Sequence, residues 1–119
     1  MFLGESKIID DRIVTVTSAL PYVHGVPHLG NFAGSVLPAE LYHRYLDLRG
    51  VKNEFICGGD VHGTPLELEA LERGEDPRDI KDRQNEKVKE AYESLGVAFS
   101  IFSDTHSDFN RKQTHDMFE

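Results

Sequence analysis

The chain has 119 residues, a length that fits one domain, and 39% of them are hydrophobic, enough to fill one modest core. Its 13 basic and 21 acidic residues give a net charge of −8, which disfavours a broad nucleic-acid surface because such surfaces neutralise phosphates with Lys and Arg. The single Cys57 excludes an internal disulfide and a multi-cysteine zinc cluster. With no run of about 18 apolar residues and no secretory leader pattern, we expect a cytoplasmic protein without a membrane segment.

The first third of the sequence predicts a strand, a loop and a helix. Residues 13–19 are β-branched with little polar alternation, which is typical of a strand buried on both faces in a parallel sheet. Residues 20–27 contain two prolines and a glycine and therefore predict a loop. A helical pattern runs from His28 to a stop at Gly50. Pro38 predicts a kink or a restart within it, because proline has no N–H for the helical hydrogen bond.

The middle of the chain predicts a second strand followed by a helix. Residues 53–60 read as a strand that ends in a glycine-rich turn. Thr64 is expected to cap the next helix in a capping box with Glu67, with Pro65 at the first helical position. That helix is expected to end near Gly74.

The last third repeats the alternation. A second proline-led helix is predicted to start at Asp76 and to end at Gly96, and residues 97–102 predict a third strand. A final helix is expected to begin near Thr105 or His106. The order strand, helix, strand, two helices, strand, helix predicts an α/β domain whose parallel strands are joined by right-handed crossovers.

An open parallel sheet binds its ligand beyond the carboxyl ends of its strands, and the first candidate site there is His28-Leu29-Gly30-Asn31. The N–H groups of a helix start attract phosphate, and the side chains of His28 and Asn31 can donate to its oxygens. The pattern is neither GxxxxGK[ST] nor GxGxxG. An equally good alternative is structural, with His28 capping the helix and Gly30 permitting close helix packing.

The second candidate site follows the second predicted strand, at Asp60 and His62. A partly desolvated carboxylate at Asp60 can bind a ligand ammonium group, and His62 can serve as an acid, a base or a polar wall. In the alternative reading, Asp60 caps the turn and His62 is a solvated loop residue.

The histidines and the cysteine do not predict a metal site. His24 and His28 are four residues apart, but Gly25 and Pro27 between them prevent one continuous helix, and no HExxH pattern follows. Cys57, inside a strand, is expected to be an inert buried thiol. The remaining histidines are expected at the surface: His43, His106 and His115.

Two segments resemble one known family. Residues 18–31 closely resemble the opening of methionyl-tRNA synthetases, in which a strand runs into an Ala-Leu-Pro-Tyr loop and then the class I HIGH signature, here His28-Leu29-Gly30-Asn31. Residues 55–65 resemble the next strand and turn of that family, at a matching spacing. The Val-Pro-His-Leu-Gly-Asn form is more similar to archaeal and eukaryotic members. The resemblance implies a Rossmann-like (HUP-type) parallel sheet flanked by helices, as in the first half of a class I catalytic domain.

The resemblance also implies roles for individual residues. His28 and Asn31 would be the catalytic contacts to the ATP phosphates, and Gly30 would leave room for the adenine. Asn31 replaces the second histidine of the signature and keeps a donor without the capacity to become cationic. Asp60 would pair with the methionine ammonium group. The apolar walls of the methionine pocket would be Ala19, Leu20 and Tyr22.

The family activates methionine with ATP and magnesium and then charges methionine tRNA, and this sequence holds only part of the required machinery. The KMSKS loop, the zinc knuckle of the connective insertion, the second half of the sheet and the anticodon-binding domain are absent. We therefore expect residues 1–119 to be the N-terminal part of the catalytic domain, with little activity alone and tRNA binding only with the missing domains. The open sheet edge predicts self-association.

Two other functions stay open on the sequence. One is a free-standing small nucleotidyltransferase, since such enzymes use a similar sheet and an HxGH phosphate cradle. The other is a non-catalytic binding module that keeps the fold and binds a partner through its acidic helices.

Overall fold

The computed structural model describes residues 13–119, so residues 1–12 of the expected domain lie outside the described part. Three parallel strands form a sheet in the order β1-β2-β3. Val16 pairs with Phe55, and Ile56 pairs with Ile101. This sheet confirms the predicted α/β class. The strands are β1 (Val14–Thr17), β2 (Asn53–Gly59) and β3 (Ile101–Asp104).

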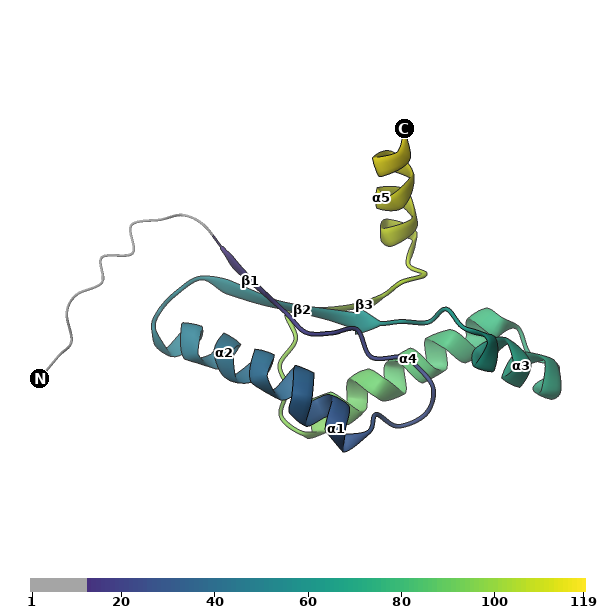
Figure 1. Cartoon of the computed structure of the whole chain (residues 1–119), viewed down its shortest axis with the longest axis horizontal. Helices are drawn as coiled ribbons and strands as arrows, with labels where there is room; N and C mark the ends of the chain where they lie inside the picture. The colour runs from purple at the N-terminus through teal and green to yellow at the C-terminus, as the bar shows by residue number, and fades with distance from the viewer. Residues whose placement is uncertain (1–12) are drawn as a thin grey trace, which may run out of the picture.

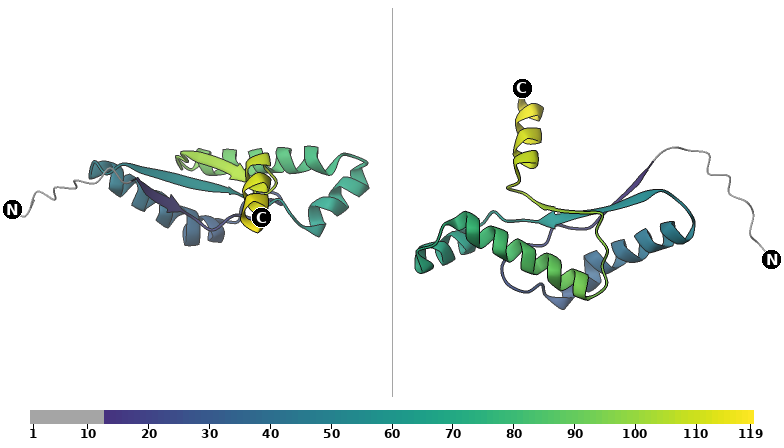
Figure 2. Two further views of the ribbon diagram at one scale, coloured as in Figure 1. Left: turned by 90° about the horizontal axis from the view of Figure 1, so that it is seen from above. Right: turned by 180° about the vertical axis from the view of Figure 1, so that it is seen from behind.

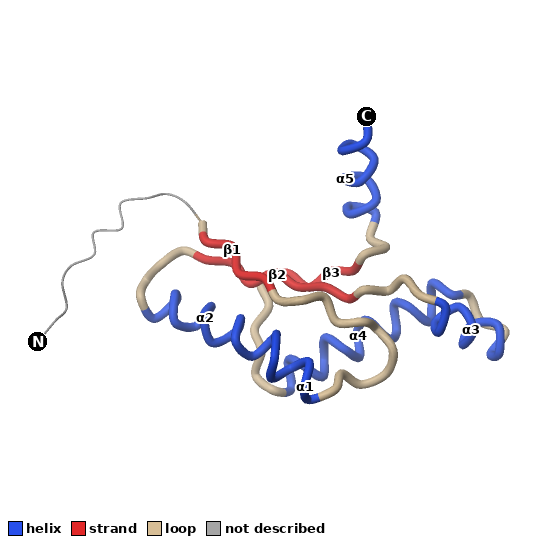
Figure 3. Tube along the Cα trace, viewed as in Figure 1, coloured by secondary structure: helices blue, strands red, loops and turns tan. Residues whose placement is uncertain are grey.

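Helices cover one face of the sheet, as Figures 1 and 2 show. Both crossovers run on this face, which is the arrangement that right-handed connections give when each new strand is added on the same side. The last helix, α5, lies on the opposite side and projects away from the sheet (Figure 3). The helical elements are α1 (Leu29–Asn31), a π-helical stretch (Phe32–Val36), α2 (Leu37–Leu48), α3 (Thr64–Arg73), α4 (Pro77–Ser94) and α5 (Asp108–Phe118).

The main core lies between the sheet and helices α2 and α4. Phe55 at the centre of β2 is fully buried, and its ring centroid lies 5.0 Å from that of Phe99. Val36 and Tyr92 close the core from the helix side. Burying an aromatic side chain such as Phe55 contributes about 1.5–3 kcal/mol. A smaller cluster joins α3 to α4 and consists of Leu66, Ala70 and Ile80.

The predicted restart at Pro38 takes the form of a π turn. The N–H of Leu37 donates to the carbonyl of Phe32, five residues back, so the helix widens just before the proline. Pro38 then lies in the first turn of α2 and has no N–H to donate to the π-helical turn that precedes it. The helix ends as predicted, with Gly50 in the left-handed region at φ 68°.

Two predicted starts lie too early in the chain. The third strand begins at Ile101 rather than at residue 97, because the N–H of Val97 still donates to the carbonyl of Tyr92 and closes the end of α4. The last helix begins at Asp108, where Ser107 caps it by accepting from a backbone N–H.

The predicted capping box of α3 is wrong by one residue. Thr64 is already the first helical residue, and Gly63, which has no side chain to cap with, holds the N-cap position. The start of α4 is as predicted, since Asp76 accepts from the N–H of Arg78 at 2.8 Å. Gly74 and Gly96 follow the ends of α3 and α4, as expected.

One histidine prediction is wrong. His43 is only 9% exposed, because it lies on the inner face of α2. Its ring centroid lies 5.9 Å from that of Phe55, and its Nδ1 is bonded to the side chain of Asn53. His106 and His115 are exposed, as predicted.

Candidate functional site

The loop after β1 runs beside the carboxyl end of β2. The N–H of Asp60 donates to the carbonyl of Pro21 at 2.8 Å, and the N–H of Val23 donates to the carbonyl of Asp60 at 3.0 Å. These bonds pair Tyr22 with Asp60 in a parallel bridge. Val23 is fully buried and anchors the loop in the core. Two residues that were predicted in separate segments, Tyr22 and Asp60, are therefore neighbours.

The carboxylate of Asp60 is half-buried at this junction. Its Oδ1 accepts from the N–H of His62 at 3.3 Å and from Oγ1 of Thr105 at 3.5 Å. The carboxylate therefore caps its own turn, as the structural alternative predicted. Both bonds end on Oδ1, so Oδ2 is the oxygen that can accept from a ligand.

The phenol of Tyr22 packs against the turn that follows Asp60. A Cβ atom on Gly63 would lie 2.3 Å from the Tyr22 hydroxyl, so a side chain at this position would have to displace the ring. Partial desolvation, followed by the carboxylates of Asp60 and Glu67, raises the pKa of Tyr22 above its ordinary value. The hydroxyl therefore stays protonated at neutral pH and can donate a hydrogen bond.

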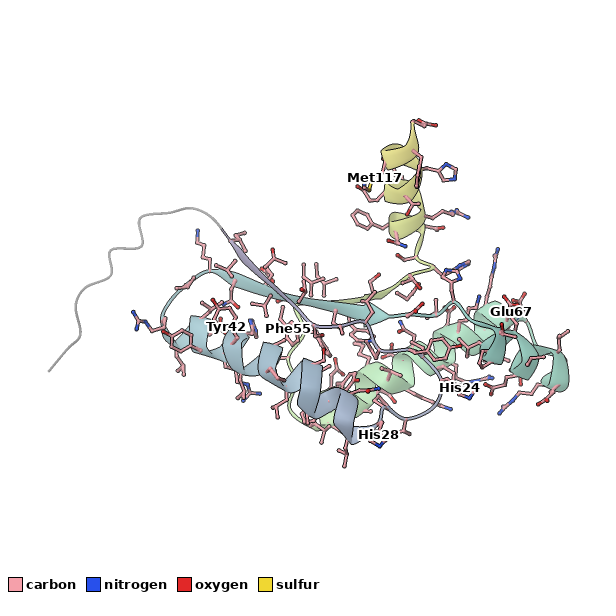
Figure 4. The ribbon with its side chains drawn as sticks, viewed as in Figure 1. His24, His28, Tyr42, Phe55, Glu67 and Met117 are labelled. Carbon is pink, nitrogen blue, oxygen red and sulfur yellow. The ribbon has the colours of Figure 1, made fainter. Side chains whose placement is uncertain are left out.

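The HIGH-like segment forms the start of a continuous helical stretch, and His28 caps it. Nδ1 of His28 accepts from the N–H of Gly30 at 2.9 Å, which is the structural role anticipated for it. Because Nδ1 is an acceptor, the proton of the neutral ring lies on Nε2. Figure 4 shows His28 at the end of α1 away from the sheet, and the residue is exposed. The cap thus presents Nε2–H as a donor toward solvent.

A hollow of about 170 Å³ lies between the loop and this helical stretch. The N–H of Ala19 donates to Oγ of Ser35 at 2.8 Å and ties the two walls together. The volume is below the roughly 300–1,000 Å³ of most small-molecule sites, so this hollow alone does not enclose two substrates. Its lining joins Asn31 with three of the four residues predicted for methionine, Ala19, Leu20 and Tyr22, but does not include Asp60. The other lining residues are Pro21, Ser35, Val36 and Tyr92.

Leu20 also lines a larger hollow of about 370 Å³ on the α5 side of the sheet. Ser18, Cys57 and Phe109 contribute to its walls. Cys57 is buried, as predicted, and accepts a hydrogen bond from Oγ of Ser18 at 3.1 Å. Residues 18–22 therefore separate two hollows, one on each face of the sheet.

Two residues at the site carried no sequence signal. Tyr92 is only 1% exposed and lines the smaller hollow, and burial, together with the Cys57 thiol, raises the pKa of its hydroxyl. Within residues 13–119 that hydroxyl has no hydrogen-bond partner, which is rare for a buried polar atom. Thr105 contacts Asp60 from the turn after β3. Tyr92 reads as a core residue of an amphipathic helix and Thr105 as a turn residue, so no local pattern distinguishes them.

The remaining histidines lie in other surroundings. His24 is exposed beside α3, where it lines a hollow with Pro65 and Leu68 (Figure 4). The rings of His62 and His106 meet edge to face at 5.2 Å. In residues 13–119, no three His, Cys, Asp or Glu side chains are grouped so as to hold a metal ion. None of the helices in this part of the chain is long and apolar enough to cross a membrane.

Comparison with known proteins shows to which family this chain belongs. The model of the family "tRNA synthetases class I (M)" matches residues 14–119. The chain belongs to this family. Among class I synthetases, a methionine–tRNA ligase of Thermofilum pendens is 47% identical over 103 residues, which are 87% of this chain and 18% of that protein. A methionine–tRNA ligase of Porphyromonas gingivalis is 42% identical over 104 residues, which are 87% of this chain and 15% of that protein.

Solved class I synthetases share the fold of this chain. Mycobacterium tuberculosis methionyl-tRNA synthetase bound by methionyl-adenylate superposes with a TM-score of 0.71 and 24% identity, covering 82% of this chain and 19% of that one. This likeness confirms the predicted Rossmann-like fold. The chain spans less than a fifth of the length of these curated relatives.

Proposed function

We propose that this chain is the N-terminal part of the catalytic domain of a methionine–tRNA ligase and that it binds methionine and ATP for the formation of methionyl-adenylate. The pairing of Tyr22 with Asp60, beside a HIGH-like helix start, is the observation that carries the proposal. The 47% identity to a methionine–tRNA ligase supports the choice of amino acid. We also propose that it acts in the cytoplasm, in keeping with its single cysteine.

The amino-acid half of the site centres on Asp60. In the proposed complex, its carboxylate pairs with the methionine ammonium group, and the carbonyl of Leu20 accepts a second ammonium hydrogen. A half-buried carboxylate binds a cation more strongly than an exposed one, because the pair is less screened by water. Ala19, Leu20 and Tyr22 provide the apolar walls that the thioether side chain requires.

The nucleotide half of the site is the start of the helical stretch. Nε2–H of His28 and the amide of Asn31 donate to the ATP phosphates, and Gly30 lets the adenine approach the backbone. Donors that are already oriented stabilise the charge that develops on the phosphate oxygens. The cap between His28 and Gly30 provides this orientation. Asn31 lines the same hollow as Tyr22, which supports a site where the two substrates meet.

The proposed reaction is an in-line displacement at phosphorus. A carboxylate oxygen of methionine attacks the α-phosphorus of ATP, supplied as its magnesium complex, and the bond to the pyrophosphate oxygen breaks with its electron pair leaving on pyrophosphate. The chain supplies positioning and charge stabilisation and needs no nucleophile of its own. Transfer of the methionyl group to methionine tRNA is proposed for the full-length enzyme.

Thermal unfolding with a ligand panel tests this proposal. The panel contains methionine, magnesium ATP, both together, and leucine, valine and isoleucine as controls. A ligand that binds only the folded state at 100 times its Kd stabilises it by about 2.7 kcal/mol. We expect a rise in Tm specific to methionine and larger with ATP. A rise with ATP alone would favour a nucleotidyltransferase, and a folded chain with no rise would favour a binding module.

We further propose that the chain self-associates through the edge of β1. Among the described residues, β1 is an outer strand of the sheet, and Ile13, directly before it, is 56% exposed. Sedimentation velocity at increasing concentration should show a dimer that Ile13→Lys abolishes. Leu48→Lys, at the exposed end of α2, is the matched control and should leave the dimer intact. A chain that stays monomeric at all concentrations would contradict this proposal.

A further inference from the structure

Thr105 follows β3 directly and contacts the chain on both sides of Asp60. Its N–H donates to the carbonyl of Gly59 at 3.0 Å, and its Oγ1 accepts from the N–H of Val61 at 3.1 Å. Val61 is 1% exposed, so its N–H depends on a protein acceptor. One residue from the turn after β3 therefore fixes the backbone immediately before and immediately after Asp60.

The hydroxyl of Thr105 also lies within reach of the carboxylate between these two bonds. A hydroxyl can accept and donate at once, and Oγ1 donates to Oδ1 of Asp60 at 3.5 Å. The distance exceeds the roughly 2.5–3.0 Å of a short O–H···O bond, as bonds in ligand-free sites often do. The N–H of His62 donates to the same oxygen at 3.3 Å.

Thr105 is itself held by the first turn of α5. Nδ2 of Asn110 donates to the carbonyl of Thr105 at 2.8 Å, and the N–H of Asn110 donates to Oγ of Ser107 at 3.2 Å. The backbone of Thr105 is thus bonded to β2 on one side and to α5 on the other. With the backbone held, the bond that Oγ1 accepts from the N–H of Val61 keeps the hydroxyl on the side of Asp60.

We propose that Thr105 is a positioning residue, which holds Oδ1 of Asp60 so that Oδ2 is presented to the ammonium group of the amino acid substrate. The inference rests on the function proposed above for Asp60. It gives the turn between β3 and α5 a role in amino-acid binding, although its side chains need not touch the substrate. Within the described residues, the hydrogen bonds of Thr105 join it to residues 59–61 and to Asn110 and not to the HIGH-like segment, so its effect should be confined to the amino-acid half.

The first test needs no ligand. Amide NMR and hydrogen exchange are recorded on the full chain for Thr105→Val, which keeps the shape but removes the hydroxyl, and for Thr105→Ser, which restores it. Thr105→Val should speed exchange at Val61 about tenfold and should shift the amide signal of His62, whereas Thr105→Ser should do neither. Thr15→Val, at an exposed threonine on β1, is the control. Unmoved signals in Thr105→Val would overturn the proposed geometry.

The second test measures the Kd values of methionine and of magnesium ATP for the same proteins. Thr105→Val should raise the Kd of methionine about tenfold and leave the Kd of magnesium ATP unchanged. Both Kd values of Thr105→Ser should be close to those of the wild type. Equal methionine binding by Thr105→Val and wild type would overturn the positioning role. A wild-type chain that does not bind methionine would instead overturn the function proposed for Asp60, which the ligand-free signals tell apart from a failure at Thr105.

Discussion

The two halves of the proposed site are assembled in different ways. The amino-acid half joins the loop at residues 21–23 to Asp60 after β2 and to Thr105 after β3, so it forms only when three distant segments pack. The nucleotide half consists of consecutive residues, in which His28 caps the helix by accepting from Gly30. We therefore expect changes in packing at the carboxyl end of the sheet to weaken methionine binding more than they weaken ATP binding.

The largest loss of stability should come from a substitution at Gly59, which disturbs the packing of the amino-acid half. A Cβ atom there would lie 2.3 Å from Cγ2 of Val23 and 2.2 Å from Oδ1 of Asn85. Because Val23 is fully buried, we expect Gly59→Ala to lower the free energy of unfolding by about 1–3 kcal/mol and to weaken the pairing of Tyr22 with Asp60. Urea denaturation measures the first effect and amide exchange the second.

A matched glycine in the helical stretch provides the control. Apart from its chain neighbours and the backbone of its own helix, a Cβ atom on Gly34 would have no atom of the described residues within 4 Å. Gly34→Ala should therefore be neutral or should stabilise the chain by about 0.5–1 kcal/mol, because alanine loses less entropy in a helix. Equal destabilisation by Gly59→Ala and Gly34→Ala would contradict the claim that the chain is tightly packed around Gly59 and open around Gly34.

An intermediate effect is expected from breaking the nucleotide half at His28. His28→Ala removes the cap and should cost about 1 kcal/mol of folding free energy, while His28→Asn should restore most of it by supplying another acceptor. Exchange of the amide of Gly30 should rise in His28→Ala, and that of Val23 should not. A rise at Val23 would show that the two halves are not assembled independently.

The smallest effect that we expect is the pH dependence of folding stability that Tyr22 causes. Its pKa is raised by partial desolvation and by Asp60 and Glu67, so the folded state holds the phenol proton more tightly than the unfolded state. The resulting stabilisation is complete below about pH 10 and is lost as the pH rises through the pKa of the folded chain. Because Tyr22 is 41% exposed, water screens much of this effect.

Ultraviolet titration of the tyrosinate checks this direction. The difference between wild type and Tyr22→Phe isolates the phenol of Tyr22, and Asp60→Asn should move its titration to lower pH by removing a negative charge. Tyr42→Phe, at an exposed tyrosine on α2, is the control. A titration of Tyr22 that ignores Asp60→Asn would contradict the proximity of the two side chains.

Features encoded by consecutive residues were predictable from the sequence. Asp76 before a proline predicts the start of α4, and Gly50 predicts the end of α2, because each signal acts within one turn of the chain. The β-branched residues before the loop similarly predict β1. The HIGH-like segment is also local, and its place at a helix start was predictable for the same reason.

Features that depend on distant contacts were not predictable. His43 is buried because α2 packs on Phe55, which its own helix does not reveal. The third strand was placed too early because residues 97–99 are apolar, although Val97 is bonded to the end of α4. The contact of Thr105 with Asp60 exists only once β3 lies beside β2. The amino-acid half of the proposed site is therefore the part that the sequence alone predicts least well.

The separate roles of Asp60 and His28 are tested most directly by calorimetric binding of methionine and of magnesium ATP to Asp60→Ala and His28→Ala. Asp60→Ala should weaken the binding of methionine about tenfold to a hundredfold, because it removes the proposed charged partner of the ammonium group, and should leave the binding of ATP unchanged. His28→Ala should weaken ATP and spare methionine. Equal loss of both ligands in either variant would contradict a site built from two independent halves.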